Sequence, residues 1–341
     1  MGKYMKKRKR SILLTILSVI LALILIAFAV GYFFLDSLLD KIERFDPELP
    51  TLSQEEVDQI LNETDPEEEI PEETVNSGDV TMPETPADVI EKQDHVINIL
   101  LIGQDRLEGQ GRQRSDAMIL CTVNTQEKTL VMTSFLRDMY VKYPDYNGKE
   151  YGSSRINVTY AIGGMTMLND CLKLNFGVDI DHNIEVDFTG FEKIIDLVGG
   201  VDINLTAAEA AWLGEDIPKG MNHMDGEMAL AYSRIRKLDS DFGRTNRQRT
   251  VLMAILNKVK SMPVTELTSL VEGMLPYITT DMSNSEIIKY VLEIFPILAN
   301  LQVTTQHIPA DGTYKNANIN GMSVLVPDFE ANIQILKDTI G

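Results

Sequence analysis

The stretch "VINILLIG", residues 96–103, decides the fold class of this chain. It is a nearly continuous apolar run, interrupted only by Asn98 and ended by Gly103, which is typical of a buried β-strand. Two further apolar runs follow, "DAMILCTV" at 116–123 and "TLVMTSF" at 129–135, joined by the polar sequence "NTQEK". We expect these two runs to pair as a β-hairpin.

Toward the C-terminus, helical and strand patterns alternate. The helix that begins after an Asn157 cap is predicted to end at Gly177, a residue that suits a left-handed helix end. Alternating strands and helices predict a layered α/β/α domain with a central mixed β-sheet and no internal repeat. The predicted helices cover residues 157–177, 189–200, 225–234, 245–262, 265–275, 283–301 and 328–340, and the further strands cover 182–188, 201–205 and 302–309.

The N-terminus predicts a membrane anchor. Residues 1–10 hold six cations and no acid, and Ser11–Leu35 follows without a single charge. This apolar run is long enough to span a bilayer as a tilted helix, and the preceding cations place residues 1–10 in the cytoplasm. A cleaved signal peptide is the alternative, but its apolar core is usually shorter and ends at a small-residue cleavage site. We therefore predict a single-pass protein of the cell membrane with an extracellular C-terminal domain.

Residues 36–94 are strongly acidic, with 20 acidic and three basic residues, and they are rich in Glu, Pro and Thr. Such a composition predicts a disordered, extended linker. The linker carries most of the formal net charge of −20, so the domain at 95–341 is only mildly acidic. Two cysteines, Cys121 and Cys171, allow either one disulfide or two buried free thiols.

Basic residues are concentrated in one short part of this acidic chain. Residues 232–249 read "YSRIRKLDSDFGRTNRQR". Arg244, Arg247 and Gln248 are spaced to share one face at the start of a helix, where an anion would balance their charge. Arg234 and Arg236 could join them if the intervening loop folds back. Guanidinium groups suit a diphosphate, although a solvated basic face is the alternative.

A second polar group lies near the predicted strand ends. Asp105 follows the first strand, Arg114 and Asp116 open the next, and Arg137 follows the third. Ends of strands are where open α/β sheets usually bind ligands. Asp105 and Asp116 together could hold Mg²⁺, which takes one or two carboxylates plus phosphate oxygens. The alternative for each residue is a surface ion pair.

Other chemistries have little support. The four histidines are scattered without a zinc-binding spacing, and neither a nucleophile elbow nor a Walker loop is present. Nucleic acid is an improbable partner for an acidic extracellular domain.

Three motifs in this order resemble the LytR–CpsA–Psr family of bacterial cell-envelope proteins. They are "RSD" at 114–116, "RD" at 137–138, and the R-x-R, D and R-x-x-R-Q pattern within 234–248. The resemblance covers about Val96–Met262. It implies a transferase that moves a glycopolymer, such as wall teichoic acid or capsule, from an undecaprenyl-diphosphate carrier to peptidoglycan. The implied partners are that lipid-linked glycopolymer, the peptidoglycan acceptor and membrane lipid, with no nucleic acid.

The resemblance also implies residue roles. It assigns Mg²⁺, with Mn²⁺ as the alternative, to Asp105 and Asp116, and it assigns catalysis to these aspartates together with Arg137. Asp105 is the candidate proton acceptor. The chain departs from the family at Leu136, where members commonly have proline. The matching diphosphate-binding residues are Arg114, Arg137, Arg234, Arg236, Arg244 and Gln248.

Two alternatives remain open at this point. One is a non-catalytic module that binds lipid diphosphates and acts in regulation. The other is a polyprenyl-diphosphate hydrolase that uses the same residues. Both require the same clustering of Arg and Asp, whereas only the transferase also requires a cleft for an acceptor sugar.

Overall fold

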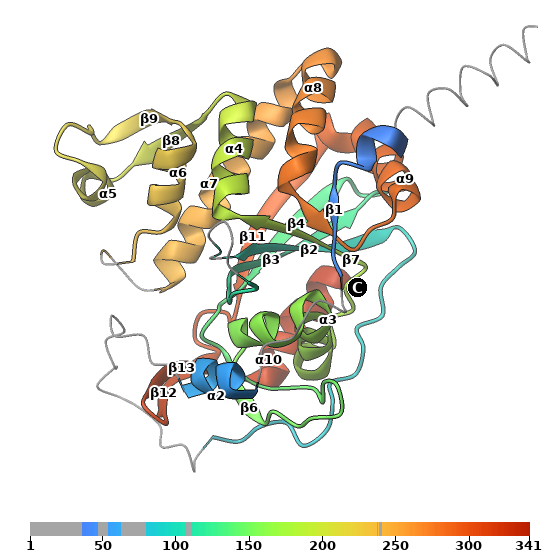
Figure 1. Cartoon of the computed structure of the whole chain (residues 1–341), viewed down its shortest axis with the longest axis vertical. Coiled ribbons are helices and arrows are strands. Elements are labelled where there is room, and N and C mark those ends of the chain that lie inside the picture. Colours follow the sequence, from blue (N-terminus) through green and yellow to red (C-terminus); the bar gives the residue numbers. More distant parts are fainter. Residues whose placement is uncertain are drawn as a thin grey trace, which may run out of the picture.

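A seven-stranded β-sheet forms the centre of the molecule. The computed structural model describes residues 36–46, 54–62, 80–104, 106, 111–236, 238 and 241–341 (Figure 1). In spatial order the strands of the sheet are β1 (Glu43–Arg44), β10 (Thr279–Thr280), β7 (His182–Asp187), β2 (Val96–Gln104), β3 (Ser115–Asn124), β4 (Thr129–Phe135) and β11 (Gln302–Ile308).

The sheet is mixed, as predicted. β3 is antiparallel to both β2 and β4, and β3 and β4 form the expected hairpin. The pairs β2–β7, β4–β11 and β1–β10 are parallel. Strands β2 and β3 therefore lie inside the sheet, where both of their faces can be covered.

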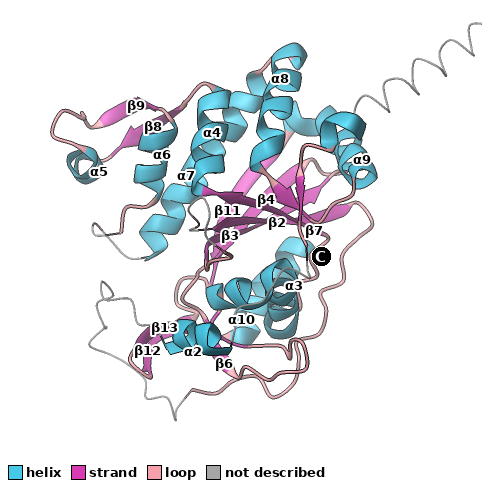
Figure 2. Ribbon diagram, in the orientation of Figure 1, coloured by secondary structure: helices cyan, strands magenta, loops and turns pink. Residues whose placement is uncertain are grey.

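Helices cover both faces of the sheet. One face carries α3 (Asn157–Phe176) and α10 (Phe329–Ile340), and the other carries α4 (Phe188–Val198), α6 (Gly226–Ser233) and α7 (Asp241–Ser261) (Figure 2). This arrangement confirms the layered α/β/α domain predicted from the alternation of strands and helices.

The side chains of β2 alternate between these two layers, as the pleat of a strand requires. Leu100 and Ile102 are buried in the main core, beneath α3 and α10. Ile99 and Leu101 point to the opposite face and are only half-buried. The layer of α4, α6 and α7 therefore leaves the sheet incompletely covered.

Several local predictions need correction. α7 begins at Asp241 rather than at residue 245, and the cap residue of α3 is Ile156 rather than Asn157. The strand β8 (Val201–Leu205) was expected in the sheet, but it pairs only with β9 (Gly220–Met224) in a separate hairpin. Strand periodicity predicts a strand without naming its partner, so the sequence could not make this distinction.

The hairpin β5–β6 (Tyr140–Lys142 and Ser153–Arg155) and the hairpin β12–β13 (Tyr314–Ile319 and Met322–Pro327) complete the strands outside the sheet. The short helix α5 (Ala207–Leu213) lies between β8 and β9. The two cysteines are separate free thiols, so the disulfide alternative is not found.

The predicted linker differs most from the structure. Within residues 36–94, β1 joins the edge of the sheet, and α2 (Gln54–Asn62) packs on α3 with Val57 buried. Ile90 is also buried, and its N–H donates to the carbonyl of Gly177 at 2.8 Å. The acidic average of the segment conceals a few apolar residues whose burial is enough to order these parts.

The predicted anchor, residues 11–35, lies outside the described residues, as does the basic tail before it. Among the helices that the structure does describe, none combines the length and the apolar character needed to cross a membrane.

Candidate active site

Asp116, at the start of β3, lies at the centre of a cluster of arginines. Its Oδ1 accepts a hydrogen bond from Nη1 of Arg137 at 2.9 Å, and its Oδ2 accepts one from Nη2 of Arg236 at 3.3 Å. Arg137 lies two residues after the end of β4, and Arg236 lies three residues after the end of α6. Because β3 and β4 are antiparallel neighbours in the hairpin, the start of β3 lies beside the end of β4, which brings Asp116 and Arg137 together.

Burial and charge act in opposite directions on this carboxylate. Burial alone would raise the pKa of Asp116, but Arg137, Arg244 and Arg236 outweigh it and lower the pKa to about 2. Asp116 is therefore ionised throughout the physiological pH range.

Two further carboxylates share the same arginines. Nε of Arg137 lies 3.4 Å from Oδ2 of Asp138 and 3.6 Å from Oδ1 of Asp241. Arg155, which is almost fully buried, lies 3.8 Å from the other oxygen of Asp138. The three carboxylates around Arg137 raise its pKa despite burial, which acts to lower it. The cluster is thus a largely buried network of alternating charge, and removing one member leaves an ion there without its partner.

Arg244 is buried, and its guanidinium group is only partly hydrogen-bonded. Its side chain is 2% exposed, and its Nη2 forms an ion pair with Asp241 one helical turn earlier in α7. Within the part of the chain that the structure describes, its buried Nε and Nη1 groups make no hydrogen bond. Buried donors without partners are unfavourable, so this geometry indicates an anionic ligand.

A large apolar cavity begins beside Arg244. Its volume is about 840 Å³, and it lies between the sheet and the layer of α4, α6 and α7. Its polar end is lined by Asp116, Arg234, Arg236, Arg244 and Gln248. Its apolar walls include Leu101, Ile119, Ile184, Val186, Phe188, Phe191, Ile194, Leu230, Leu252, Ile255, Met274 and Ile278.

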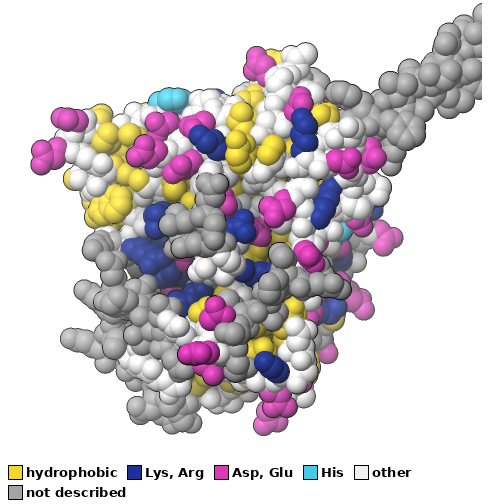
Figure 3. Space-filling view, viewed as in Figure 1, with side chains coloured by type: hydrophobic (Ala, Val, Ile, Leu, Met, Phe, Trp, Pro, Cys, Tyr) yellow, Lys and Arg dark blue, Asp and Glu magenta, His cyan; other side chains and the backbone are white. Residues whose placement is uncertain are grey.

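The cavity therefore has two chemically different ends. The guanidinium of Arg234 stacks on the ring of Phe188 at 4.4 Å, at the boundary between the charged end and the apolar walls. In the space-filling view, Lys and Arg side chains gather between the lower ends of α6 and α7 and the β12–β13 hairpin (Figure 3). An anionic head group attached to a long apolar tail matches this division.

Comparison with known proteins identifies the family. The sequence profile of the LytR_cpsA_psr family matches residues 55–339. The chain belongs to the LytR–CpsA–Psr family. The regulatory protein MsrR of Staphylococcus aureus is 32% identical over 252 residues, which cover 72% of this chain and 75% of MsrR.

Two further members link the family to cell-wall polymers. The polyisoprenyl-teichoic acid–peptidoglycan teichoic acid transferase TagU of Bacillus mycoides is 38% identical over 164 residues, which cover 48% of this chain and 52% of TagU. A structure of TagT bound to LI-WTA has 27% identity and a TM-score of 0.60, and the match covers 76% of this chain and 95% of that one.

Most of the residues singled out by the resemblance to the LytR–CpsA–Psr family converge on this site. Asp116, Arg137, Arg236 and Arg244 are linked through direct contacts or through shared carboxylates. Arg234 and Gln248 line the same end of the cavity. Asp105 lies outside the described residues, so its predicted role stays a prediction.

Two arginines lie elsewhere. Nη2 of Arg114 donates to the carbonyl of Ile60 in α2 at 3.2 Å, and Arg114 does not line the cavity. Arg247, expected to share a face with Arg244, is instead buried and donates to Glu209 at 2.8 Å and to the carbonyl of Ile235 at 2.9 Å. Arg247 therefore holds α7 against α5 and the end of α6.

Sequence reasoning missed the carboxylates that hold the arginines in place. Asp138 and Asp241 both lie within the quoted motifs, next to or three residues before an assigned arginine, so this proximity was the available signal. Arg155 had no signal in the sequence, because its contact with Asp138 depends on the β5–β6 hairpin.

The residues present are compatible with Mg²⁺ in charge and in ligand type. Asp116 is an ionised carboxylate at the polar end of the cavity, where phosphate oxygens could complete the coordination. The described residues contain no cluster of three or more Asp, Glu, His or Cys side chains that could bind a metal unaided. A cation here would therefore depend on substrate oxygens and on the predicted second ligand, Asp105.

Proposed function

We propose that this protein is a membrane-anchored phosphotransferase that moves a glycopolymer from an undecaprenyl-diphosphate carrier to peptidoglycan. The observation that carries the proposal is Arg244, which lines the polar end of an apolar cavity and whose buried Nε and Nη1 make no hydrogen bond within the described residues. The similarity to TagU, a teichoic acid transferase, supports the class of reaction.

The cavity suggests how the lipid carrier binds. The prenyl chain would occupy the apolar walls between the sheet and α4, which places the diphosphate beside Arg234, Arg236 and Arg244. These guanidinium groups would donate hydrogen bonds to its oxygens and offset its charge. Gln248, one turn after Arg244 in α7, would add a neutral donor on the same face.

The reaction is a phosphoryl transfer. A hydroxyl oxygen of peptidoglycan forms a bond to the phosphorus that carries the glycopolymer, and the bond from that phosphorus to undecaprenyl phosphate breaks. The proton of the hydroxyl passes to a base, for which Asp105 is our candidate, and the lipid phosphate leaves with the electrons of the broken bond. Arg137 and Arg236 hold Asp116 in place at the reacting end.

Mg²⁺ held by Asp116 and Asp105 would offset negative charge on the diphosphate as the bond to the leaving group breaks. Positioning and neutralisation of charge are the main requirements of phosphoryl transfer, and the arginines meet most of them.

The test uses the full-length protein in liposomes with Mg²⁺, an undecaprenyl-diphosphate-linked glycan and peptidoglycan oligomers. We expect a joined glycan–peptidoglycan product together with undecaprenyl phosphate. Arg234→Ala should lower kcat/KM by roughly 10²-fold, in line with the loss of one donor to a developing charge. Because Arg234 is exposed and packs mainly on Phe188, this change should leave the fold intact.

Lys193→Ala is the matched control, since it removes an exposed cation from α4, the helix that begins at Phe188, and does not line the cavity. It should retain full activity. Release of lipid phosphate without a joined product would show that the protein is a hydrolase rather than a transferase. Carrier binding without turnover would favour the regulatory module.

A further inference from the structure

The described chain begins in direct contact with helix α9 (Asn284–Ile294). Nδ2 of Asn284 donates to the carbonyl of Asp36 at 3.2 Å, to Oδ1 of Asp36 at 3.0 Å and to Oδ1 of Asp40 at 3.0 Å. Asp36 is the first residue after the apolar run 11–35 that predicts the membrane anchor. The start of α9 is therefore held within one residue of the end of that predicted anchor.

Apolar packing strengthens this attachment. Leu39 and Ile42 are both 7% exposed and pack with Leu275 of the short helix η2 (Leu275–Tyr277). Ile287 and Ile288 of α9 pack against the same cluster. Residues 36–46 lie along the fold beside α9 in Figure 1. The part of the chain nearest the predicted anchor, from Asp36 onward, is therefore packed into the domain.

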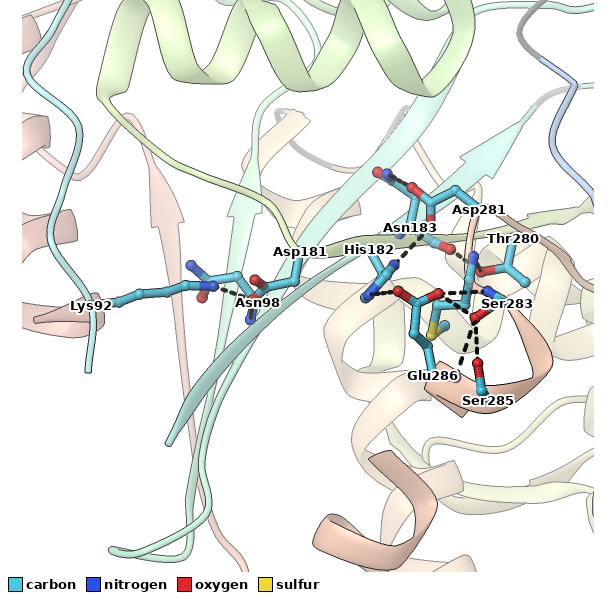
Figure 4. A network of polar contacts seen from close by, with 11 residues as sticks. Lys92, Asn98, Asp181, His182, Asn183, Thr280, Asp281, Ser283, Ser285 and Glu286 are labelled. Atoms are coloured by element: carbon cyan, nitrogen blue, oxygen red, sulfur yellow. Dashed lines mark hydrogen bonds and ion pairs between the residues drawn. The ribbon is translucent and has the colours of Figure 1, made fainter. Parts of the chain in front are cut away.

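α9 is also firmly attached to the sheet. His182 of β7 lies 3.5 Å from Asp281, just before α9, and 3.8 Å from Glu286 in its first turn (Figure 4). The backbone N–H of Asn183 donates to Oδ1 of Asp281 at 2.8 Å, and its side-chain Nδ2 donates to Oδ2 of Asp281 at 2.6 Å. Ser283 caps the helix in a reciprocal capping box with Glu286.

An apolar row continues along α9 from this attachment. Val291 and Leu292 follow Ile288 at spacings of three and four, and Phe295, at the start of helix η3 (Phe295–Asn300), follows at a spacing of seven, so the four side chains share one face. Ile288 touches the segment after the predicted anchor, whereas the next three are exposed by 54%, 69% and 43%. Three large apolar side chains in one exposed row are typical of an interaction surface.

The apolar end of the cavity lies on the same side of the molecule. Met274 and Ile278, which line the cavity, flank the helix η2. Between them, Leu275 packs on Leu39 and Ile42. The end of the cavity remote from the arginines is therefore adjacent to the first residues after the predicted anchor.

We propose that the row Val291, Leu292 and Phe295 is a membrane-contact surface that rests on the outer leaflet of the bilayer. The occupant is the lipid surface itself, because the predicted anchor ends where this row begins. Contact at this row would place the apolar end of the cavity at the level where a prenyl chain leaves the membrane. The functional consequence rests on the proposed lipid-carrier substrate, whereas the contact itself does not.

The test reads the environment of Leu292 in the full-length protein in phosphatidylglycerol–phosphatidylethanolamine vesicles. An environment-sensitive fluorophore is attached to the thiol of the Leu292→Cys variant. The quencher is a lipid with a nitroxide near the start of its acyl chain. The native thiols should not compete for the label, because burial raises the pKa of Cys121 to about 12 and Cys171 is fully buried. We expect the nitroxide lipid to lower the fluorescence about twofold.

Met221→Cys is the matched control. Met221 has the same 69% exposure as Leu292, but it lies on β9, on the opposite side of the helical layer from α9 (Figure 1). Unchanged fluorescence at Leu292 would overturn the proposal, and so would equal quenching at both positions. A signal at Leu292 that depends on protein density and not on the nitroxide lipid would indicate a second copy of the chain and would also overturn it.

A second measurement links the surface to turnover. The double change Leu292→Asp and Phe295→Asp should lower kcat/KM for a bilayer-embedded lipid carrier about tenfold, because charge opposes contact with lipid. It should leave kcat/KM unchanged for a short-chain, water-soluble prenyl diphosphate. An equal loss with both substrates would contradict a membrane role. If the unmodified protein transferred no glycan, the proposed function would be wrong. The fluorescence experiment would still test the membrane contact, because it does not depend on turnover.

Discussion

The two faces of the central sheet are built from the same strands and yet have different interiors. On the side of α3 and α10, Leu100 and Ile102 of β2 are buried in a continuous core that includes both helices. On the side of α4, α6 and α7, Leu101 of the same strand lines an 840 Å³ cavity with arginines at one end. Protein interiors are usually close-packed, so an unfilled face of this size indicates a site for a ligand.

The difference also concerns charge. The face covered by α3 and α10, the filled face, obtains its stability from apolar packing. The face covered by α4, α6 and α7, the open face, concentrates ionised groups around Arg137 and Asp116. A buried ion pair contributes little net stability, but removing one partner is strongly destabilising. We therefore expect ligand binding, rather than packing, to determine the choice of residues on the open face. Three measurements test this contrast between packing and charge.

The largest expected effect comes from Arg137→Ala. This change leaves Asp116, Asp138 and Asp241 buried near one another without the cation that they share. The free energy of unfolding should fall by about 3–5 kcal/mol, as is typical when one member of a buried ionic network is removed. Urea denaturation of the purified protein measures this change.

Lys173→Ala provides the control for Arg137→Ala. Lys173 pairs with Asp179 at 2.8 Å, and both side chains are nearly half exposed, so the loss should stay below about 1 kcal/mol. If Arg137→Ala destabilised the protein no more than this control does, the buried network would not be a structural element. Loss of activity in Arg137→Ala alone cannot separate a role in catalysis from a role in folding, whereas Arg234→Ala can.

The next effect compares two neighbours on β2. Leu100→Ala should lower the free energy of unfolding by about 2–5 kcal/mol, because it opens a void in the filled core. Leu101→Ala should cost clearly less, about 1 kcal/mol, because its side chain already borders open space. The second change should instead raise KM for the proposed lipid carrier. Equal destabilisation by both changes would mean that the cavity closes in solution.

The strands that carry this contrast could be predicted from the sequence, whereas the contrast itself could not. The strands β2, β3 and β4 were predicted because runs such as 96–103 are long and apolar, and their limits agree with the structure within one or two residues. The cavity was not predictable, since Leu100 and Leu101 are the same residue type and differ only in what lies opposite. The order within residues 36–46 was missed because two buried side chains, Leu39 and Ile42, are diluted among acids.

The candidate site shows the same limit. Arg137, Arg236 and Arg244 were singled out from motifs, and the structure places them around Asp116 and Asp241. The direction of a side chain depends on tertiary contacts, so the sequence could not show that Arg247 turns toward Glu209 or that Arg114 reaches the carbonyl of Ile60. Type and spacing of residues indicated which arginines to consider, and packing decided which of them reach the cluster around Asp116.

The smallest effect concerns the edge of the sheet, where α9 is attached. A hydrogen bond to Asp281 raises the pKa of His182 above its ordinary value of 6.5, although burial acts in the opposite direction, and Glu286 and Asp181 add to the increase. The rings of His182 and Tyr290 pack against each other in a T-shaped arrangement. Because the folded state binds this proton more tightly than the unfolded state, its stabilising effect is complete below about pH 6.5 and is lost as the pH rises through the raised pKa.

His182→Gln should remove this dependence while keeping a polar side chain of similar size. We expect the unmodified protein to exceed the variant by about 1 kcal/mol or less in free energy of unfolding at mildly acidic pH, and the difference should vanish in alkaline solution. Urea denaturation across this range measures it. A difference that grew with pH would show that His182 stabilises α9 as a neutral side chain, and the edge of the sheet would then owe its strength to packing, as the filled face does.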